Sequence, residues 1–494
     1  MSDERGRQIE AVDALTVRAP VPEVIRFGDW VMEHREFGLV RVRTRDGICG
    51  YGFTLSRDGP IAEMIHDYIA PRYVGRPTDE PKAAFESVQR SNLSCLIGGI
   101  GLRALSIVDL AVWDAEAKRR GLPIAVMLGG SNVAMPVTGI AGYPPSIGPA
   151  EVIEQVESLY EQGYRRVKLP MAPDAARSKA RLEAAVSVSD DLWVGCDGAW
   201  VFNAVDDAVA FLESLDMTLG WFEDAFPPGN ARIIAALRER SPFPIAFGDE
   251  QGGAHYPESL IAHSAVDFVR VDVTTMGGIT SIGDILAQAD EAGLRVAPHM
   301  NALEHAQIFG GLGRPDLPLE WGIVGSGVDQ FADSLAQPVV RDGLMDPLPD
   351  EPGFGRLVNP AWLRSVPAAG GGRVLEASES RFGGCLEDFE VGDEYRHWPG
   401  KTITEAESHL FCMLTLAVHP LHVDSAHFDG TQGPFERPVV AGPHIYSLLL
   451  GMSVPDISGR ALANLGTTDL RHTAPVYPGD TLYGTSTVLE TRPS

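Results

Sequence analysis

The sequence predicts an α/β protein whose largest part is a parallel β/α barrel, with an α+β segment before it and a smaller module after it. From about residue 136, eight short apolar runs alternate with stretches of helical spacing, a pattern typical of parallel β/α units. Several of these runs end in a charged or polar residue, which suits strands that open onto one barrel mouth. A chain of 494 residues is also long enough for two or three domains.

The segment before the barrel carries both strand and helix signals. Residues 38–53 have the apolar alternation of two strands around an Arg-Asp-Gly turn. Residues 103–120 place apolar side chains at helical spacing, and Gly121 together with Pro123 predicts the end of that helix. Roughly the first 125 residues are therefore expected to form an α+β unit.

The composition limits the partners of this protein. The net charge is −27 and the sequence contains no basic stripe, so a nucleic-acid partner is not expected. An acidic surface also repels anionic membranes and, in general, anionic substrates. A site for a carboxylate substrate therefore needs its own local positive charge, such as a metal ion.

The cysteines and the apolar runs predict the cellular compartment of the protein. The five cysteines are scattered without Cys-x-x-Cys pairing, which favours a reducing compartment and argues against a structural zinc site. The chain begins with a polar segment that lacks the apolar core of a signal peptide. No run approaches the roughly 20 apolar residues that a membrane helix needs. We expect a cytoplasmic protein without membrane spans.

The residues at the strand ends are the candidates for chemistry. They are Lys168, Asp197, Glu223, Asp249, Asp272, His299 and Glu320. The same interval of 26 residues separates Asp197 from Glu223 and Glu223 from Asp249, which fits one β/α unit each. Three carboxylates without a cysteine or histidine suit a hard cation that keeps open positions, and Mg²⁺ is the natural choice. Each acid taken singly could instead be a helix N-cap or a solvated charge.

A base for proton transfer is predicted beside these acids. Asp272 and His299 end consecutive runs, so adjacent strands would place the carboxylate against the imidazole, orient the ring and raise its basicity. His299 is therefore the candidate general base, although a single histidine is more often structural. Lys168 would add a cation, and Glu320, held protonated or hydrogen-bonded by its neighbours, could stabilise an oxyanion. The alternative for Glu320 is a surface or salt-bridged acid.

Several segments resemble, in the expected order, those of the enolase superfamily in its mandelate racemase and muconate lactonizing enzyme branch. Residues 103–130 resemble the end of the capping domain, and WFED and FGDEQ resemble the second and third metal-ligand segments. The segment VDVTTMGGIT resembles that of the sixth strand, with Asp272, and PHMNALEH resembles that of the seventh, with His299. The likeness extends over roughly residues 10–365.

That resemblance implies a (β/α)₇β, TIM-like barrel beneath a capping domain. Residues 1–130 would form the α+β capping domain, completed by about 340–366, and residues 131–339 would form the barrel. The small, Gly-rich residues 367–381 are expected to be a linker, and residues 382–494 a separate module.

The same resemblance implies roles for the acids. Asp197, Glu223 and Asp249 would bind Mg²⁺, with Glu250 as the alternative to Asp249. Cap loops around residues 18–28 and 51–60 would set the choice of a small carboxylate substrate.

One departure from the family decides the reaction that we expect. The family often ends the second barrel strand with Lys-x-Lys, whereas this chain has Lys168-Leu169-Pro170. Proline cannot carry a proton, so the position of the second base is lost, and racemisation usually needs a base on each face. The prediction is a Mg²⁺-dependent carbon–oxygen lyase, a dehydratase that removes the proton α to the carboxylate of an acid sugar and gives a 2-keto acid. A racemase or epimerase of a 2-hydroxy acid and an inert assembly protein are alternatives.

The C-terminal module resembles MaoC-like hotdog hydratases. A capping-box signature at Thr404 to Glu407 opens an apolar helix. Of the family's Asp-x-Asn-Pro-x-His motif the chain keeps His422, but Ala417 stands in the place of the aspartate. The family's last strands are also missing, so we expect a partial hotdog (α+β) domain. Its unpaired edge favours a homo-oligomer, and an enoyl-CoA hydratase or assembly role is the alternative function.

Overall fold

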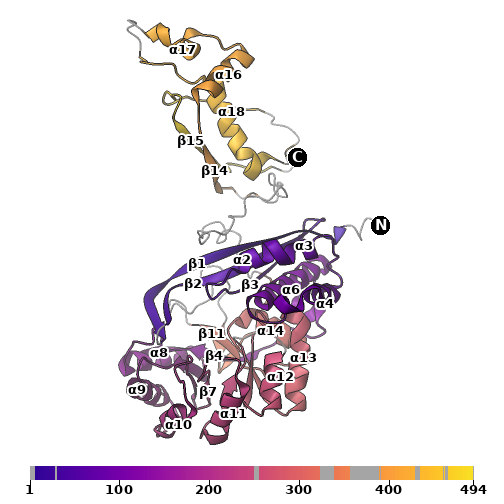
Figure 1. Cartoon of the computed structure of the whole chain (residues 1–494), viewed down its shortest axis with the longest axis vertical. Coiled ribbons are helices and arrows are strands. Elements are labelled where there is room, and N and C mark those ends of the chain that lie inside the picture. Colours follow the sequence, from indigo (N-terminus) through magenta and orange to yellow (C-terminus); the bar gives the residue numbers. More distant parts are fainter. Residues whose placement is uncertain are drawn as a thin grey trace. The chain divides into compact units, whose positions relative to one another are not determined.

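The chain forms two compact units in the computed structural model, Met1–Val374 and Leu375–Ser494 (Figure 1). The structure describes residues 6–27, 30–249, 255–322, 339–355, 389, 391–428, 434–459, 461 and 466–492. Among them, no helix combines the length and the apolar character that crossing a membrane requires. The expected linker at 367–381 and the alternative ligand Glu250 lie outside the described residues.

The first unit begins with an antiparallel sheet and a long helix that lies against it. The strands pair in the order β1 (Ile9–Phe27), β2 (Trp30–Thr44) and β3 (Cys49–Leu55). Helix α6 (Gly99–Arg120) ends at Gly121, whose φ of +67° suits glycine. Gly50 and Gly52 allow the close approach of the helix, because a Cβ on them would lie 2.0 and 2.3 Å from carbonyl oxygens of α6.

Shorter helical segments complete this cap. They are α2 (Ile61–Glu63), the π-helix η1 (Met64–Ile69), α3 (Ala70–Tyr73), α4 (Pro81–Ser91), α5 (Leu93–Leu96) and α7 (Ile124–Met127). Apolar side chains of α2, η1, α3, α4, α5 and α6 pack on the sheet, so the cap has its own hydrophobic core. Ile124 of α7 belongs instead to the core that contains the barrel.

Eight parallel strands follow, and they coincide with the eight apolar runs of the sequence. They are β4 (Met135–Ile140), β5 (Arg166–Pro170), β6 (Trp193–Asp197), β7 (Trp221–Glu223), β8 (Ile245–Phe247), β9 (Phe268–Val271), β10 (Arg295–Pro298) and β11 (Leu319–Gly322). Neighbouring strands pair in chain order from β4 to β10, and β11 pairs with β4. A parallel bridge between Asn301 and Glu320 joins the two ends of the curled sheet.

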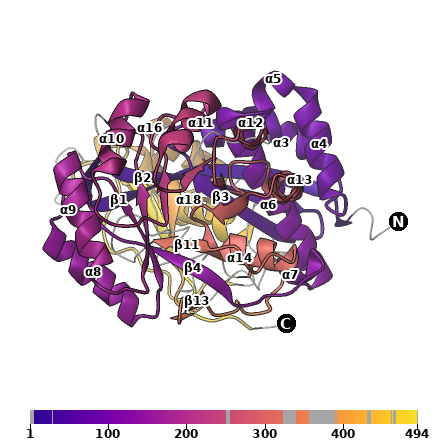
Figure 2. The same ribbon diagram turned by 90° about the horizontal axis from the view of Figure 1, so that it is seen from below.

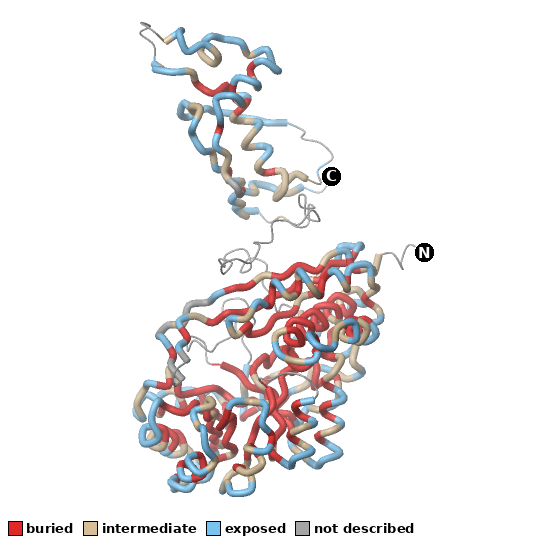
Figure 3. Tube along the Cα trace, in the orientation of Figure 1, coloured by how far each residue is buried: buried red, intermediate tan, exposed pale blue. Residues whose placement is uncertain are grey.

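Helices connect these strands on the outside of the sheet (Figure 2). They are α8 (Pro149–Glu161), α9 (Ala175–Val186), α10 (Val205–Glu213), α11 (Ala231–Arg240), α12 (His255–Ala262), α13 (Gly278–Glu291) and α14 (Ala302–Gly311). The alternation of strand and helix is therefore that of the predicted (β/α)₇β barrel. Buried residues run along the strands and the inner faces of the helices (Figure 3).

The segment after the barrel returns to both parts of the first unit. Strands β12 (Val340–Arg341) and β13 (Leu344–Met345) form a hairpin, and β13 pairs antiparallel with β4. Further on, Phe354 donates its backbone N–H to Asp114 of α6 at 2.8 Å. These contacts attach the segment to the barrel and to the cap.

The second unit is a small α+β body. Strands β14 (Glu394–Thr402) and β15 (Thr481–Thr487) pair antiparallel, and α18 (Gly442–Ser453) contacts both of them. The other segments are α16 (Glu405–Thr415), α17 (Pro420–Val423), the 3₁₀ helix η3 (Ser425–Phe428) and the π-helix η4 (Val454–Ser458). Helix α16 begins with the expected capping box, in which Thr404 and Glu407 bond each other's backbone N–H groups.

Candidate active site

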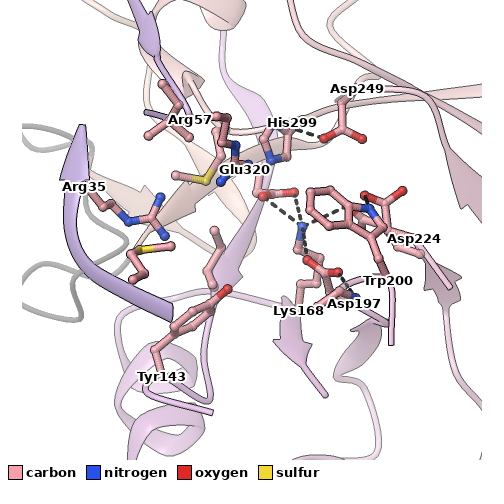
Figure 4. Close-up of a pocket in the computed structure, with 16 residues that line it drawn as sticks. Arg35, Arg57, Tyr143, Lys168, Asp197, Trp200, Asp224, Asp249, His299 and Glu320 are labelled. Carbon is pink, nitrogen blue, oxygen red and sulfur yellow. Dashed lines mark hydrogen bonds and ion pairs between the residues drawn. The ribbon is translucent and has the colours of Figure 1, made fainter. Parts of the chain in front are cut away.

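A pocket lies at the carboxyl ends of the barrel strands and is closed on one side by the cap (Figure 4). The residues that line it are Met32, Arg35, Leu55, Arg57, Ile140, Tyr143, Lys168, Asp197, Ala199, Trp200, Glu223, Asp224, Asp249, His299, Met300 and Glu320. Strand register explains why distant residues meet there. Asp197 pairs with Glu223 across β6 and β7, and Val271 pairs with Pro298, which brings Asp272 next to His299.

A compact group of carboxylates forms one wall of the pocket. Glu223, Asp224 and Asp249 are buried, and each offers an oxygen that lies within 4.8 Å of the others. Glu223 Oε2 and Asp249 Oδ1 are buried without a hydrogen-bond partner among the described residues. Because an unpaired buried carboxylate oxygen is costly, this group fits a hard divalent cation.

Asp197 lies beside this group but has a different neighbour. One of its oxygens accepts the backbone N–H of Ala199 at 2.9 Å, and the other lies 3.7 Å from Lys168 Nζ. It lines the pocket as expected, and its role as a metal ligand stays a prediction.

Two buried cations hold the other acids of the site in place. Lys168 Nζ lies 3.1 Å from Glu223 Oε1 and 3.0 Å from both carboxylate oxygens of Glu320. Arg270 Nε donates to the same Glu223 oxygen at 3.1 Å, and another nitrogen of Arg270 bonds Glu320. One oxygen of Glu223 is therefore occupied by cations, which leaves Oε2 for a different partner.

These contacts shift the pKa values of Lys168 and Glu320. Burial would lower the pKa of Lys168, but Glu223 and Glu320 outweigh it and raise that pKa well above its usual value. Burial would likewise raise the pKa of Glu320, but Lys168 and Arg270 lower it to about 2. These shifts favour an ionised, hydrogen-bonded Glu320 and a positively charged Lys168.

The expected histidine–aspartate pair is present at the next strand ends. His299 Nδ1 lies 3.2 Å from Asp272 Oδ2 and 3.3 Å from Asp249 Oδ2. Thr274 donates its backbone N–H and its hydroxyl to Asp272 Oδ1 at 2.8 Å, and Asn301 Nδ2 donates at 3.1 Å. Asp272 is therefore held from several sides and in turn orients the imidazole, so that Nε2 lies on the side of the ring away from these acids.

The charge state of this pair follows from the same neighbours. Burial would lower the pKa of His299, but the charge of Asp249 and the hydrogen bond to Asp272 raise it to about 9. Burial would raise the pKa of Asp272, but His299 outweighs it and lowers that pKa to about 2. A positive charge placed at Asp249 would oppose the shift of His299, so cation binding and the protonation of this imidazole are coupled.

Left-handed backbone conformations gather at this mouth. They occur at Ala199, Trp200, Asp224, Met300 and Asn301, where φ lies between 47° and 60°. A non-glycine residue pays a conformational cost in this region, and such strain is typically concentrated at functional sites. The tight turns after β6, β7 and β10 are what aim the side chains of these segments into the pocket.

Several residues of the site were not predicted from the sequence. They are Arg35, Arg57, Tyr143, Asp224 and Arg270. Arg270 had a signal, because it is a charge inside the apolar run Phe268–Val271 and shares a strand face with Asp272. The acid that follows Glu223 was a weaker signal. Arg57 falls in the cap loop around residues 51–60 that the resemblance gave for substrate choice, although the residue was not singled out, and Arg35 of β2 had no signal.

The remaining predicted site residue, His422, belongs to the second unit. It lies in α17, where its Nδ1 donates to the carbonyl of Val439 at 2.8 Å. The predicted partner position, Ala417, carries no group that could activate water, so the pair expected for a hotdog hydratase is incomplete.

Family models match almost the whole chain. The mandelate racemase/muconate lactonizing enzyme N-terminal domain matches residues 11–129, the enolase C-terminal domain-like family matches 151–362, and a MaoC-like domain matches 388–494. The chain belongs to the enolase superfamily, in its mandelate racemase/muconate lactonizing enzyme group, and carries a MaoC-like domain after the barrel.

Named relatives are similar over a little more than half of the chain. The L-talarate/galactarate dehydratase of Salmonella typhimurium is 28% identical over 280 residues, which are 55% of this chain and 69% of the relative. A D-galactonate dehydratase family member of a Streptomyces species is 29% identical over 301 residues, 53% of this chain and 66% of the relative. The structure of an L-talarate dehydratase from Polaromonas, complexed with Mg and L-glucarate, superposes with a TM-score of 0.63 at 22% identity and covers 73% of this chain and 97% of that chain.

Proposed function

We propose that this protein is a Mg²⁺-dependent dehydratase that removes the proton α to the carboxylate of an acid sugar and yields a 2-keto acid. The observation that carries the proposal is the contact between His299 and the acid Asp249, because it joins a candidate base to a candidate cation site in one pocket. The relatives named above as dehydratases of acid sugars support the same reaction class.

The pocket offers a suitable set of ligands for the cation. Glu223 and Asp249 present buried oxygens that have no partner among the described residues, and both are hard donors of the kind that Mg²⁺ prefers. We propose Asp197 as the third ligand, as the family resemblance implies, with Asp224 as its competitor. When bound, the cation would supply positive charge against the negative charge that builds on the substrate carboxylate as its α-proton leaves.

The other residues of the pocket have separate roles in the proposed reaction. His299, oriented by Asp272, takes the α-proton, and the same imidazolium can return a proton to the departing β-hydroxyl group. Lys168 places a fixed positive charge beside the substrate carboxylate. Glu320 keeps that lysine in place and remains ionised itself.

The residues at the end of β5, the second strand of the barrel, disfavour racemisation. Pro170 replaces the residue that could serve as a base on the other face, and Lys168 is bonded to two carboxylates that keep it protonated. A protonated lysine cannot accept a proton, which leaves His299 as the candidate base among the described residues, once a bound cation opposes the rise of its pKa. One-base chemistry suits elimination, in which the carbanion is consumed by loss of the β-hydroxyl.

A substrate panel tests the proposal. The full chain is incubated with Mg²⁺ and a set of six-carbon acid sugars in ²H₂O, and NMR follows both exchange of the α-proton and formation of a 2-keto acid. We expect a 2-keto acid from at least one sugar, no product with His299→Asn, and normal turnover with the control His263→Asn, which replaces an exposed histidine of the same unit. Exchange without loss of water would favour an epimerase instead, and neither signal across the panel would refute the proposal.

A further inference from the structure

Three polar side chains of the second unit are joined by hydrogen bonds. His397 of β14 lies with Nδ1 2.6 Å from Asp456 Oδ2 of η4 and with Nε2 2.7 Å from Ser486 Oγ of β15. The order is serine, histidine, aspartate, and both distances are short enough for hydrogen bonds. A histidine that bonds a serine on one side and a carboxylate on the other is the arrangement that activates serine as a nucleophile, and it recurs on unrelated folds.

The sheet brings the histidine and the serine together. His397 lies directly opposite Gly484 in the register of β14 and β15, and Ser486 follows Gly484 by two residues, on the same face of the strand. Gly484 makes room for the imidazole, because a Cβ there would lie 3.2 Å from His397 Cδ2. Helix α18 packs alongside both strands and continues into η4, which carries Asp456 (Figure 1). Three elements that pack together therefore position the three groups.

The aspartate determines the direction of the two hydrogen bonds. A carboxylate can only accept, so Nδ1 of His397 carries the proton of the neutral ring and donates to Asp456. Nε2 is then the acceptor nitrogen, and Ser486 donates its hydroxyl hydrogen to it. This is the tautomer that a general base needs, because the serine can pass its proton to the ring as its oxygen attacks.

The surroundings of the three groups suit the same roles. The His397 side chain is only 1% exposed, which shields its two hydrogen bonds from water, whereas Ser486 is half-buried and within reach of a ligand. Leu449 and Met452 of α18 lie close to the ring, since a Cβ on Gly484 would be 3.7 and 3.6 Å from their side chains. Apolar groups near a nucleophile suit an uncharged acyl chain.

We propose that the second unit carries an esterase site in which Ser486 attacks the carbonyl carbon of an ester with an uncharged acyl chain. As the bond from Oγ to that carbon forms, Nε2 of His397 takes the hydroxyl proton, and Asp456 stabilises the imidazolium. The bond to the leaving alkoxide oxygen then breaks, and this oxygen takes the proton from Nε2. Water repeats both steps on the acyl-serine, so the net reaction converts an ester and water into a carboxylic acid and an alcohol. The inference does not depend on the reaction proposed for the barrel.

A phosphonylating probe tests the nucleophile in the full chain. Diisopropyl fluorophosphate bonds an activated serine with loss of fluoride, and mass spectrometry of peptides locates the adduct. We expect labelling of Ser486, at a rate that falls at least about 10²-fold in His397→Gln. Ser447→Ala removes an exposed serine of α18 and is the matched control, in which Ser486 is labelled at the wild-type rate.

Hydrolysis of p-nitrophenyl butyrate tests the reaction itself. Ser486→Ala removes one hydroxyl group and should lower the rate at least about 10²-fold, to that of the ester in buffer with an unrelated protein. EDTA should leave the wild-type rate unchanged, because no step uses a cation. The midpoint of thermal unfolding is measured for each variant, and Ser486→Ala decides the matter if His397→Gln does not fold.

Asp456 acts through the histidine and is a positioning residue. Asp456→Asn should slow ester hydrolysis at least about 10²-fold, since an amide can hold the ring in the wrong tautomer. Asp456→Glu keeps the carboxylate, and the 35% exposure of Asp456 leaves room for the longer side chain, so this variant should retain more than about a tenth of the wild-type rate. A merely structural role would not distinguish the two variants in this way.

Four results would each overturn the inference. They are labelling of Ser486 no faster than that of Ser447, hydrolysis by folded Ser486→Ala at the wild-type rate, loss of hydrolysis in EDTA, and equal rates in the two Asp456 variants. The first two would show that the hydrogen bonds of His397 serve the fold alone. The third would assign the ester hydrolysis to a metal site, and the fourth would remove the carboxylate from the mechanism.

Discussion

Lys168 Nζ lies 3.0 Å from each carboxylate oxygen of Glu320, inside the barrel and between strands that do not pair with each other. The lysine belongs to β5 and the glutamate to β11, and β4 lies between these strands. Arg270 of β9 and Glu223 of β7 extend the pair into a buried network. The network links strands around the barrel, so its charges are part of the fold as well as of the pocket.

Removing the lysine should therefore destabilise the protein. In Lys168→Met the buried carboxylates Glu223 and Glu320 lose a shared cation, and we expect the free energy of unfolding to fall by about 3 kcal/mol. Urea denaturation followed by tryptophan fluorescence measures the change. Lys179→Met is the control, since this partly exposed lysine pairs with exposed Asp216 and should cost less than about 0.5 kcal/mol. Equal effects of the two variants would show that the buried network adds nothing to stability.

Replacing Asp272, which pairs with His299, should slow proton exchange without destabilising the fold. Asp272→Asn removes the charge that raises the basicity of His299 and leaves a side chain of the same shape, so we expect exchange of the substrate α-proton to slow by about 10² to 10⁴-fold. NMR in ²H₂O measures that rate. Asp284→Asn, on the exposed face of α13, should exchange at the wild-type rate. An Asp272 variant as fast as this control would remove Asp272 from the mechanism.

The third cation ligand can be identified by a pair of matched substitutions. Asp197 follows the family pattern, whereas Asp224 lies within the compact carboxylate group and accepts a bond from Trp200 Nε1 at 3.2 Å. We expect Asp197→Asn to weaken Mg²⁺ binding at least about tenfold and Asp224→Asn to weaken it less than about threefold, because only the first would remove a ligand. Calorimetric titration with Mg²⁺ measures both. The reverse order would assign the position to Asp224.

The acids at the strand ends could be predicted because a regular repeat encodes them. One β/α unit separates Asp197, Glu223 and Asp249, so parallel strands in register bring such residues to one mouth whatever the details of the loops. His299 and Asp272 followed from the same rule, since β9 and β10 are neighbours. Functional residues at a barrel mouth can therefore be predicted from sequence where they follow the regular interval of one β/α unit.

The rest of the site depends on geometry that no local pattern encodes. Arg35 reaches the pocket from β2 only because the cap packs over the barrel, and its sequence neighbours resemble any strand. The two bonds from Lys168 to Glu320 cross a strand, and they favour the ionised form of Glu320, which the sequence left open. Asp224 enters the carboxylate group because its φ is +50°, and the local sequence does not predict this left-handed conformation for an aspartate.

A second histidine connects the segments that carry the proton-transfer pair. His305 of α14 is fully buried, donates from Nδ1 to the carbonyl of Met300 at 2.8 Å and accepts the backbone N–H of Val273 at Nε2 at 3.2 Å. Met300 follows His299 and Val273 follows Asp272, so one neutral ring holds the backbone beside both partners. An imidazolium has no acceptor nitrogen and could not make both bonds.

The protein should consequently lose stability below neutral pH. Burial lowers the pKa of His305 to about 4, whereas in the unfolded chain a histidine takes up its proton near pH 6.5. The unfolded state therefore binds more protons between these values, and the stabilisation present above pH 6.5 is lost as the pH falls towards 4. We expect this one group to reduce the free energy of unfolding by about 2 kcal/mol between pH 7 and pH 5. Urea denaturation at the two pH values measures the change in the wild-type protein and in His305→Gln.

The His305→Gln variant separates the contribution of His305 to the pH dependence of stability from that of all other titrating groups. His305→Gln should be less stable than the wild type at pH 7, because the buried bonds are disturbed, but its stability should fall less between pH 7 and pH 5, since the proton-binding site is gone. His263→Gln, which replaces an exposed histidine whose Nδ1 bonds Ser259, should keep the wild-type slope. An identical pH slope in His305→Gln and the wild type would mean that His305 does not titrate between the folded and unfolded states, and the acid sensitivity would then have to come from the carboxylates of the pocket.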